Sequence, residues 1–199
     1  MGIDNQQLIQ IYTLREKVRQ LDTPKLLEER KKWISNLLIQ NSDLWTFEMY
    51  KIDENIIKSK RDIPQFYNIF HNTRTKTKSE TCAEIDKLSK EEAVKIICEF
   101  CLSLMKMGYH FAVFDCEGSR SPHIRIYDFE ELESLDAYKR EKAQAFFWRK
   151  VSPFLFHYLD SGMWADNHPY QIEFSIHFKY FTPFDLLFEY MPEVKKCKV

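Results

Sequence analysis

The sequence contains no long hydrophobic run, only four glycines and no internal repeat. No window approaches the roughly 18 consecutive apolar residues that a membrane-spanning helix requires. The opening residues, MGIDNQQLIQ, lack the basic and apolar regions of a signal peptide, and Gln6 stands where a myristoylation signal prefers Ser or Thr. We therefore expect an intracellular protein, in the cytoplasm, nucleoid or nucleus, with no membrane partner.

Cysteine usage argues against a disulfide-stabilised protein, and net charge argues against a globally basic one. Five cysteines at irregular spacing do not form the even set of a disulfide framework. Cys98 and Cys101 form a CxxC inside a helical pattern, and their spacing from Cys82 and Cys116 matches no recognised zinc site, so we expect core thiols. A formal net charge of −1 excludes a globally basic nucleic-acid protein and leaves only local patches.

Hydrophobic periodicity predicts an α+β fold. Residues 4–21 and 24–40 show helical spacing and predict an N-terminal helical hairpin, and 44–52 predicts a strand. Residues 81–88, 109–115 and 123–129 predict further strands, and the alternating stretch 170–180 predicts a half-buried one. Ser89 and Glu92 form a capping box for a helix that ends at Gly108, and a second helical region covers 130–152. This order favours helices packed on one face of a sheet.

A basic segment lies between residues 58 and 78. One acid, Asp62, stands against six basic residues, and aromatic side chains are interleaved among them. Two interpretations remain open: a solvated loop, or a surface that contacts nucleic-acid phosphates and stacks on bases. Within this region, residues 72–80 predict a polar, mobile loop. The basic residues are Lys58, Lys60, Arg61, Arg74, Lys76 and Lys78.

Polar residues alternate with apolar ones on three of the predicted strands. Glu84 and Asp86 share one face of the first. Such residues often serve only solubility, but two neighbouring carboxylates repel each other unless a cation lies between them. Glu173, on the polar face of the last strand, would complete an oxygen site for Mg²⁺ or Mn²⁺. Before the middle strand, the turn GSRSPH supplies donors suited to triphosphate oxygens, namely Arg120, Ser121 and His123.

These motifs resemble the three motifs of the archaeo-eukaryotic primase superfamily, the primase-polymerases. The resemblance covers about residues 80–180 and is best in SRSPHI, which is similar to the Ser-x-His strand start of that superfamily. It implies a core related to the RNA-recognition-motif (RRM) fold and a template-directed nucleotidyltransferase site. By this likeness the metal-binding catalytic residues are Glu84, Asp86 and Glu173, and the nucleotide contacts are Arg120, Ser121, His123, His177 and Lys179.

The resemblance implies a DNA primase or primase-polymerase that makes primers from nucleoside triphosphates on single-stranded DNA. A helicase or a large primase subunit on another chain would be its partner. Glu84 and Glu173 stand where the family commonly has Asp, which favours an alternative, an inactive nucleic-acid-binding accessory subunit. A metal-dependent nuclease is a third hypothesis. We predict a helical segment (1–43), a primase-like core (44–190) and a tail (191–199).

Overall fold

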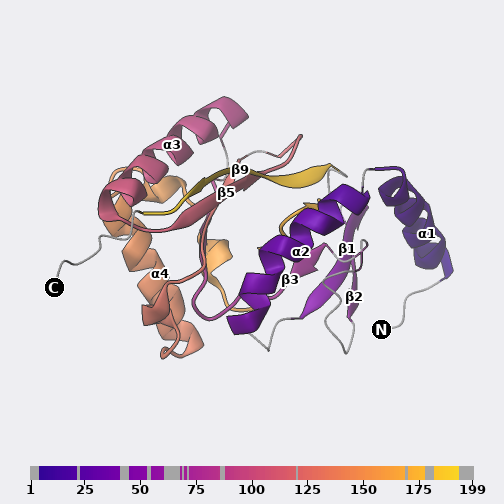
Figure 1. Ribbon diagram of the computed structural model, residues 1–199, viewed down its shortest axis with the longest axis horizontal. Helices are drawn as coiled ribbons and strands as arrows, with labels where there is room; N and C mark the ends of the chain where they lie inside the picture. The colour runs from indigo at the N-terminus through magenta and orange to yellow at the C-terminus, as the bar shows by residue number, and fades with distance from the viewer. Residues whose placement is uncertain are drawn as a thin grey trace. The chain divides into compact units, whose positions relative to one another are not determined.

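The structure is a computed structural model of the 199-residue chain (Figure 1). It describes residues 5–21, 23–40, 45–52, 55–60, 68, 70, 72–85, 88–119, 121–168, 170–177 and 182–192. The described part is a mixed α+β protein with four α-helices and two sheets, which confirms the predicted fold class. Its finer likeness to an RRM fold stays a prediction.

The chain divides into two compact units. The first contains Met1–Thr77, Cys116–Gly118 and Pro169–Asp185, and the second contains Lys78–Asp115, Ser119–His168 and Leu186–Val199. The predicted segments 1–43, 44–190 and 191–199 cut the chain at other points, and the tail beyond residue 192 lies outside the described residues.

The N-terminal helical hairpin of the first unit is confirmed. It consists of α1 (Asn5–Arg19) and α2 (Thr23–Gln40). Leu14 and Val18, one helical turn apart, are buried on α1. On α2, the ring of Trp33 meets Phe174 edge to face, with centroids 6.0 Å apart. The α1 helix therefore buries two apolar side chains one turn apart, and α2 contacts Phe174 of the same unit.

The sheet of the first unit has the strand order β2-β1-β3-β7. It contains β1 (Thr46–Ile52), β2 (Asn55–Lys60), β3 (Thr73–Arg74) and β7 (Tyr170–Gln171), all paired antiparallel. A second antiparallel pair joins β8 (Ser175–Ile176) to the start of β9 (Pro183–Tyr190). The β3 and β7 strands place Arg74 opposite Tyr170 in the register.

The second unit contains β4 (Thr81–Ala83), β5 (Phe111–Asp115), β6 (His123–Ile126) and the end of β9. Their order is β4-β6-β5-β9, so β6 is an interior strand with antiparallel partners on both sides. All four residues of β6 are buried, including the polar ones. The expected polar face of this strand is therefore closed to solvent.

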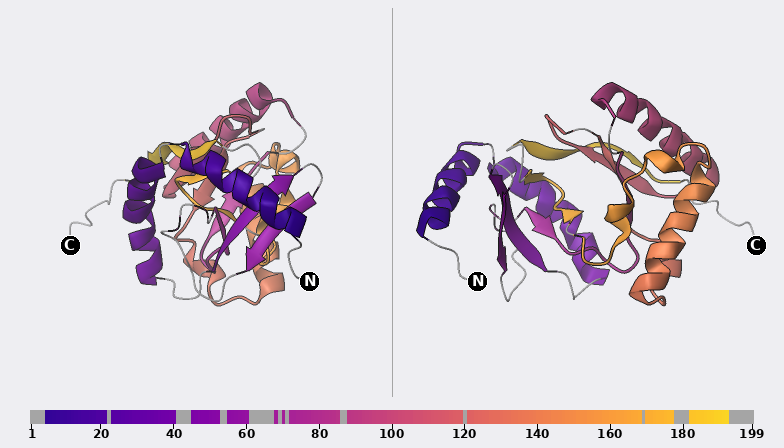
Figure 2. Two further views of the ribbon diagram at one scale, coloured as in Figure 1. Left: turned by 90° about the vertical axis from the view of Figure 1, so that its right-hand side faces the viewer. Right: turned by 180° about the vertical axis from the view of Figure 1, so that it is seen from behind.

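Two helices complete the second unit (Figure 2). The α3 helix (Lys90–Met107) has the predicted capping box of Ser89 and Glu92 and ends at Gly108, whose φ of 77° is the left-handed conformation that glycine permits. The α4 helix spans Ala137–Val151. Phe100 of α3 and Trp148 of α4 meet edge to face at 5.8 Å. Short 3-10 helices η1 (Glu130–Leu132), η2 (Phe156–Tyr158) and η3 (Ser161–Trp164) flank α4.

Two local predictions are wrong. The stretch 170–180 is not one alternating strand, because a turn at residues 173–174 separates β7 from β8 and gives Phe174 a φ of 52°. Every residue from 170 to 175 is buried, so no polar face exists there. The predicted loop at 72–80 includes β3 and is largely buried. No helix in the described ranges is both long and apolar enough to cross a membrane.

Candidate functional site

The GSRSPH turn is fastened to the end of β4 in the second unit. Ser121 is fully buried, and its hydroxyl accepts a hydrogen bond from the backbone N–H of Ile85 at 3.1 Å. The same hydroxyl donates to the carbonyl of Pro122 at 2.8 Å. Ser121 is therefore a positioning residue, which corrects the predicted direct contact with a nucleotide. Its bond ties the Ser-x-His turn to the Glu-x-Asp segment.

His123, at the start of β6, faces Glu84. Its Nε2 lies 3.5 Å from Oε2 of Glu84, whose side chain is 30% exposed. Burial, aided by the charge of Arg125, lowers the pKa of His123 to about 3. The short approach to Glu84 would favour a charged imidazole, but desolvation dominates because His123 is only 8% exposed. Burial therefore disfavours the charged form of the imidazole, and the predicted contact of His123 with a nucleotide stays a prediction.

A lysine braces the other side of the turn. Lys90, the first residue of α3, donates from Nζ to Oδ1 of Asp115 at 2.6 Å and to the hydroxyl of Ser119 at 2.8 Å. Ser119 in turn donates to Asp115. The charges of Lys90 and Asp115 both act on His123 electrostatically. Sequence reasoning missed this anchor, because nothing in the spacing of residues 90 and 115 indicates contact.

A carboxylate that the sequence did not reveal stands beside Glu84. Ile85 forms an antiparallel bridge with Leu159, and Asp160 donates its backbone N–H to the carbonyl of Glu84 at 2.9 Å. This register sets Asp160 across from Glu84, on the face opposite the buried Ile85 and Leu159. Oδ1 of Asp160 accepts from the N–H of Gly162 at 2.9 Å, which leaves further carboxylate lone pairs.

The segment that carries Asp160 is held against β4 by two indoles. Trp164 of η3 donates its Nε1–H to the carbonyl of Cys82 at 3.1 Å, and Trp148 of α4 donates to the hydroxyl of Thr81 at 2.9 Å. All four residues are buried. Sequence alone did not indicate these two hydrogen bonds, because they join residues far apart in the chain.

Glu173, the third predicted metal ligand, has another role. It lies in the first unit, in the turn between β7 and β8, and both its oxygens accept from Arg74 at 2.8 and 3.2 Å. Neither side chain of this pair has any exposed surface. Arg30 is also buried nearby, and burial lowers its pKa to about 10 while the charge of Glu173 opposes that shift. Glu173 is thus the counter-ion of buried guanidinium groups.

The basic segment is likewise rearranged. Arg74 is fully buried and cannot contact a phosphate, so its predicted nucleic-acid role is wrong. Lys76 is half-buried, with Nζ 5.9 Å from the ring centroid of Tyr170, and Lys78 is exposed. For Lys58 and Lys60 only the backbone of β2 is described, and Arg61 lies outside the described residues.

Of the remaining predicted site residues, three lie outside the described residues and one is buried in the first unit. Asp86, Arg120 and Lys179 lie outside the described residues, and His177, in the first unit, is buried with its backbone N–H on the carbonyl of Thr182 at 2.9 Å. Among the residues that the structure describes, no group of three His, Cys, Asp or Glu side chains is arranged to hold a metal ion. The structure brings together Glu84, Ser121 and His123 of the predicted set.

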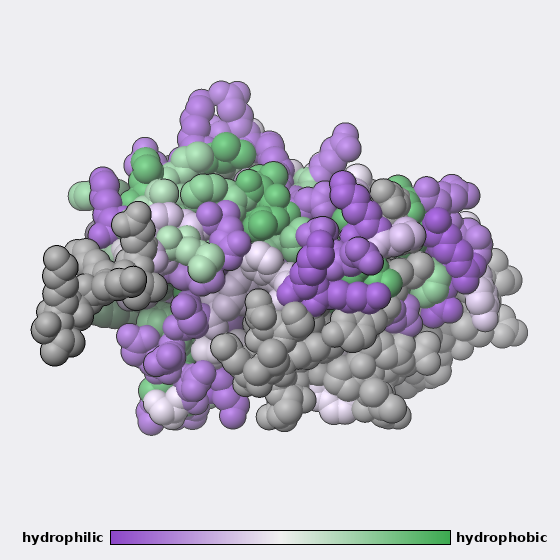
Figure 3. Space-filling model, in the orientation of Figure 1, coloured by the Kyte–Doolittle hydropathy of each residue, from purple (hydrophilic) through white to green (hydrophobic). Residues whose placement is uncertain are grey.

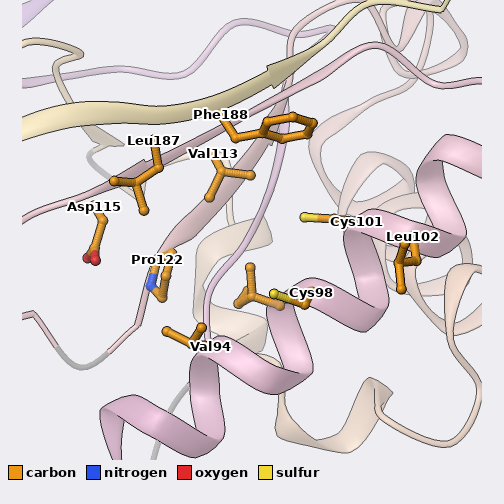
Figure 4. A pocket seen from close by; sticks show the side chains of 10 residues that line it. Val94, Cys98, Cys101, Leu102, Val113, Asp115, Pro122, Leu187 and Phe188 are labelled. Carbon is orange, nitrogen blue, oxygen red and sulfur yellow. The ribbon is translucent and has the colours of Figure 1, made fainter.

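A pocket opens next to the turn. It has a volume of ≈ 390 Å³ and lies between α3 and the strands β5 and β9, with Asp115 and Pro122 at one end (Figure 4). Cys98 and Cys101 of α3 line it, so the CxxC faces an apolar space. Apolar side chains also gather on the surface over α3 and β9 (Figure 3), where Leu102 and Leu187 are exposed.

Comparison with known proteins gives no family. A scan of protein-family models, a search of curated proteins and a search of solved structures found no match to this chain.

Proposed function

We propose that this chain is a primase-like nucleotidyltransferase that makes primers on single-stranded DNA from nucleoside triphosphates. One observation carries the proposal: the bond between Ile85 and Ser121 assembles the Glu-x-Asp segment and the Ser-x-His turn in one unit, with His123 on Glu84. Two sequence motifs 36 residues apart thereby meet as the resemblance requires.

The acidic residues of the second unit fit a hard divalent cation such as Mg²⁺ or Mn²⁺. Carboxylate oxygens are its preferred ligands, and Glu84 and Asp160 share a face of the β4 bridge. Asp86, two residues after Glu84, would add a third carboxylate. Glu173 does not fit, because both its oxygens are bound to Arg74. We therefore assign the metal to Glu84, Asp86 and Asp160.

When bound, divalent ions supply charge neutralisation at phosphate oxygens and a more acidic attacking hydroxyl. The protein's own residues would do the rest. Ser121 fixes the turn, and His123, with its Nε2 3.5 Å from Oε2 of Glu84, would position that carboxylate. Lys90 is 40% exposed and its ammonium group is held beside the turn by Asp115. In the proposed complex, this ammonium group would contact triphosphate oxygens.

One observation favours a second candidate, a primase-fold accessory subunit without catalysis. The third acidic motif position is occupied by Glu173, and its carboxylate is committed to Arg74 in a pair with no exposed surface. If Asp160 does not replace Glu173 at the metal, the chain would retain binding without synthesis.

The test is primer synthesis on a single-stranded template with nucleoside triphosphates and Mn²⁺ or Mg²⁺. We expect new oligonucleotide product from the wild-type chain and at least about a hundredfold less from Asp86→Ala and Asp160→Asn. Asn at 160 keeps an acceptor for Gly162, so folding is preserved. Asp128→Asn, at an exposed acid, is the matched control and should retain activity.

The alternatives give different readouts. Template binding without product in the wild-type chain would overturn the catalytic proposal in favour of the accessory subunit. Template shortening would identify a nuclease instead. Full activity in Asp160→Asn would overturn the assignment of Asp160.

A further inference from the structure

The exposed side chains of α4 are basic or aromatic, apart from Ala137 and Glu141. An α-helix turns about 100° per residue, so residues four apart form a stripe. Such a stripe runs through Tyr138, Lys142, Phe146 and Lys150, and Arg149 lies beside it. The buried face of the same helix, formed by residues such as Gln144 and Val151, points the opposite way. We call these five residues the α4 face. Lys139 also lies on this side of the helix, where it is paired with Asp136 at 3.2 Å.

Large aromatic rings on this face are left in solvent. Tyr138 is 70% exposed and Phe146 is 72% exposed, although the neighbouring Phe147 and Trp148 are buried. Phe154, just beyond the end of the helix, is 86% exposed. A folded chain rarely leaves several large rings together at its surface unless they contact a ligand or partner.

The charge of the face is of one sign. Glu141 is the only acid of α4, and it lies to the side of the α4 face. Basic residues in the last turn of a helix interact favourably with the helix dipole. This interaction explains why Arg149 and Lys150 are basic, but it does not explain Lys142 near the middle of the helix. Nζ of Lys142 stands 5.4 Å from the ring centroid of Tyr138, so cation and ring are already adjacent.

The outward surface of α3 differs. There, Glu91 and Lys95 pair at 2.7 Å, and Glu92 and Glu99 are also exposed. Mixed charges of this kind are those of an ordinary solvated helix. The contrast indicates that the composition of the α4 face is particular to that helix, which in Figure 2 (right panel) lies at the edge of the second unit.

From these observations, we infer that the α4 face binds single-stranded nucleic acid. Unpaired bases stack on exposed aromatic rings, and interleaved lysines and arginines contact the phosphates. A duplex offers its phosphates but hides its base faces, so the exposed rings favour a single strand. The inference rests on the proposed function, since both make nucleic acid the ligand. It places the nucleic acid on α4 and not on the basic segment, where Arg74 is buried.

The experiment measures fluorescence anisotropy of a labelled oligothymidylate with the full-length chain. We expect Phe146→Ala to weaken binding roughly 5- to 150-fold, the loss of one stacked base. Lys150→Glu should weaken it and flatten the dependence of log affinity on log salt by about 0.7 for the lost phosphate contact. A duplex of the same length should bind less tightly and respond less to Phe146→Ala.

The controls match each change on α3. Lys106→Glu reverses an exposed charge in the last turn of α3, as Lys150→Glu does in α4, and Leu102→Ala removes exposed apolar surface. Both should bind like the wild-type chain. Circular dichroism of each variant confirms folding.

Equal affinity of the α4 and α3 variants would overturn the inference, while the proposed function would stand if primer synthesis persisted. If the wild-type protein makes no primer but binds the oligonucleotide through Phe146, the inference is supported and the proposed enzymatic function is contradicted. Absence of binding, with self-association that Phe146→Ala abolishes in sedimentation, would overturn it in favour of a protein interface.

Discussion

The backbone N–H of Ile85 donates to the hydroxyl of Ser121 at 3.1 Å, and both residues are buried. This one bond connects the segment after β4 to the turn before β6. Because β4 and β6 are already paired, the bond fixes how the chain leaves that pair, and with it the separation of Glu84 and His123.

Ser121→Ala should destabilise the protein, because the N–H of Ile85 loses its acceptor in the interior. An unsatisfied buried donor costs about 1–3 kcal/mol. Urea unfolding followed by circular dichroism measures the free energy of unfolding. Ser134→Ala, at an exposed serine, should change it by less than about 0.5 kcal/mol. Equal, small effects of both substitutions would show that the Ser121 bond contributes nothing.

Glu173→Gln should be strongly destabilising, because it leaves Arg74 buried without its counter-ion and removes a charge that also acts on Arg30. Breaking a buried pair costs about 3–5 kcal/mol. The double variant Arg74→Met, Glu173→Leu should recover much of the loss in urea unfolding. Glu91→Gln, at an exposed pair, is the control and should be silent. A stable Glu173→Gln protein would contradict the structural role.

The stability of the metal-free protein should depend on pH through His123. Burial lowers its folded pKa to about 3 from 6.5, so the imidazole is neutral in both states above pH 6.5. Below that, the unfolded chain takes up a proton that the folded chain does not, and the free energy of unfolding falls as pH drops from 6.5 toward 3. The slope is at most about 1.4 kcal/mol per pH unit.

Urea unfolding in chelator at several pH values measures this slope. His123→Gln should remove it, whereas His157→Gln, at an exposed position, should keep it. If both variants retain the wild-type slope, His123 does not titrate as its burial predicts.

Cys101 should resist alkylation in the folded protein. Burial, with a smaller contribution from Cys98, raises the pKa of the Cys101 thiol from 9.0 to about 12, and thiolates are the reactive form. The exposed Cys98 should therefore react first with iodoacetamide near neutral pH, as peptide mass mapping would show. In urea, Cys98 and Cys101 should react at similar rates.

The same shift in the pKa of Cys101 predicts a dependence of stability on pH. The unfolded thiol ionises at lower pH than the folded one, so the free energy of unfolding should fall as pH rises above 9.0.

Local signals made the helices predictable. Ser89 and Glu92 bond each other's backbone, and Gly108 ends the helix in the left-handed region, so both ends of α3 are determined by nearby residues. The strand β6 was predictable for the same reason, from the alternation in HIRI. The alternation did not indicate that β6 is an interior strand of the sheet. Because it is interior, its polar residues His123 and Arg125 are buried.

Long-range partners account for the errors. Glu173 looked like a surface carboxylate because its counter-ion, Arg74, lies 99 residues earlier in the chain. Asp160 was missed because its position depends on the bridge between Ile85 and Leu159. Phe146 stands in an aromatic run, and only its angular position on α4 separates this exposed ring from the buried Phe147.

The first unit is assembled from three separate stretches of chain, and one of them, Cys116–Gly118, is flanked on both sides by the second unit. No single protease nick or stop codon can release either half intact. Any attempt to divide the protein into its two units genetically has to cut the chain at several points.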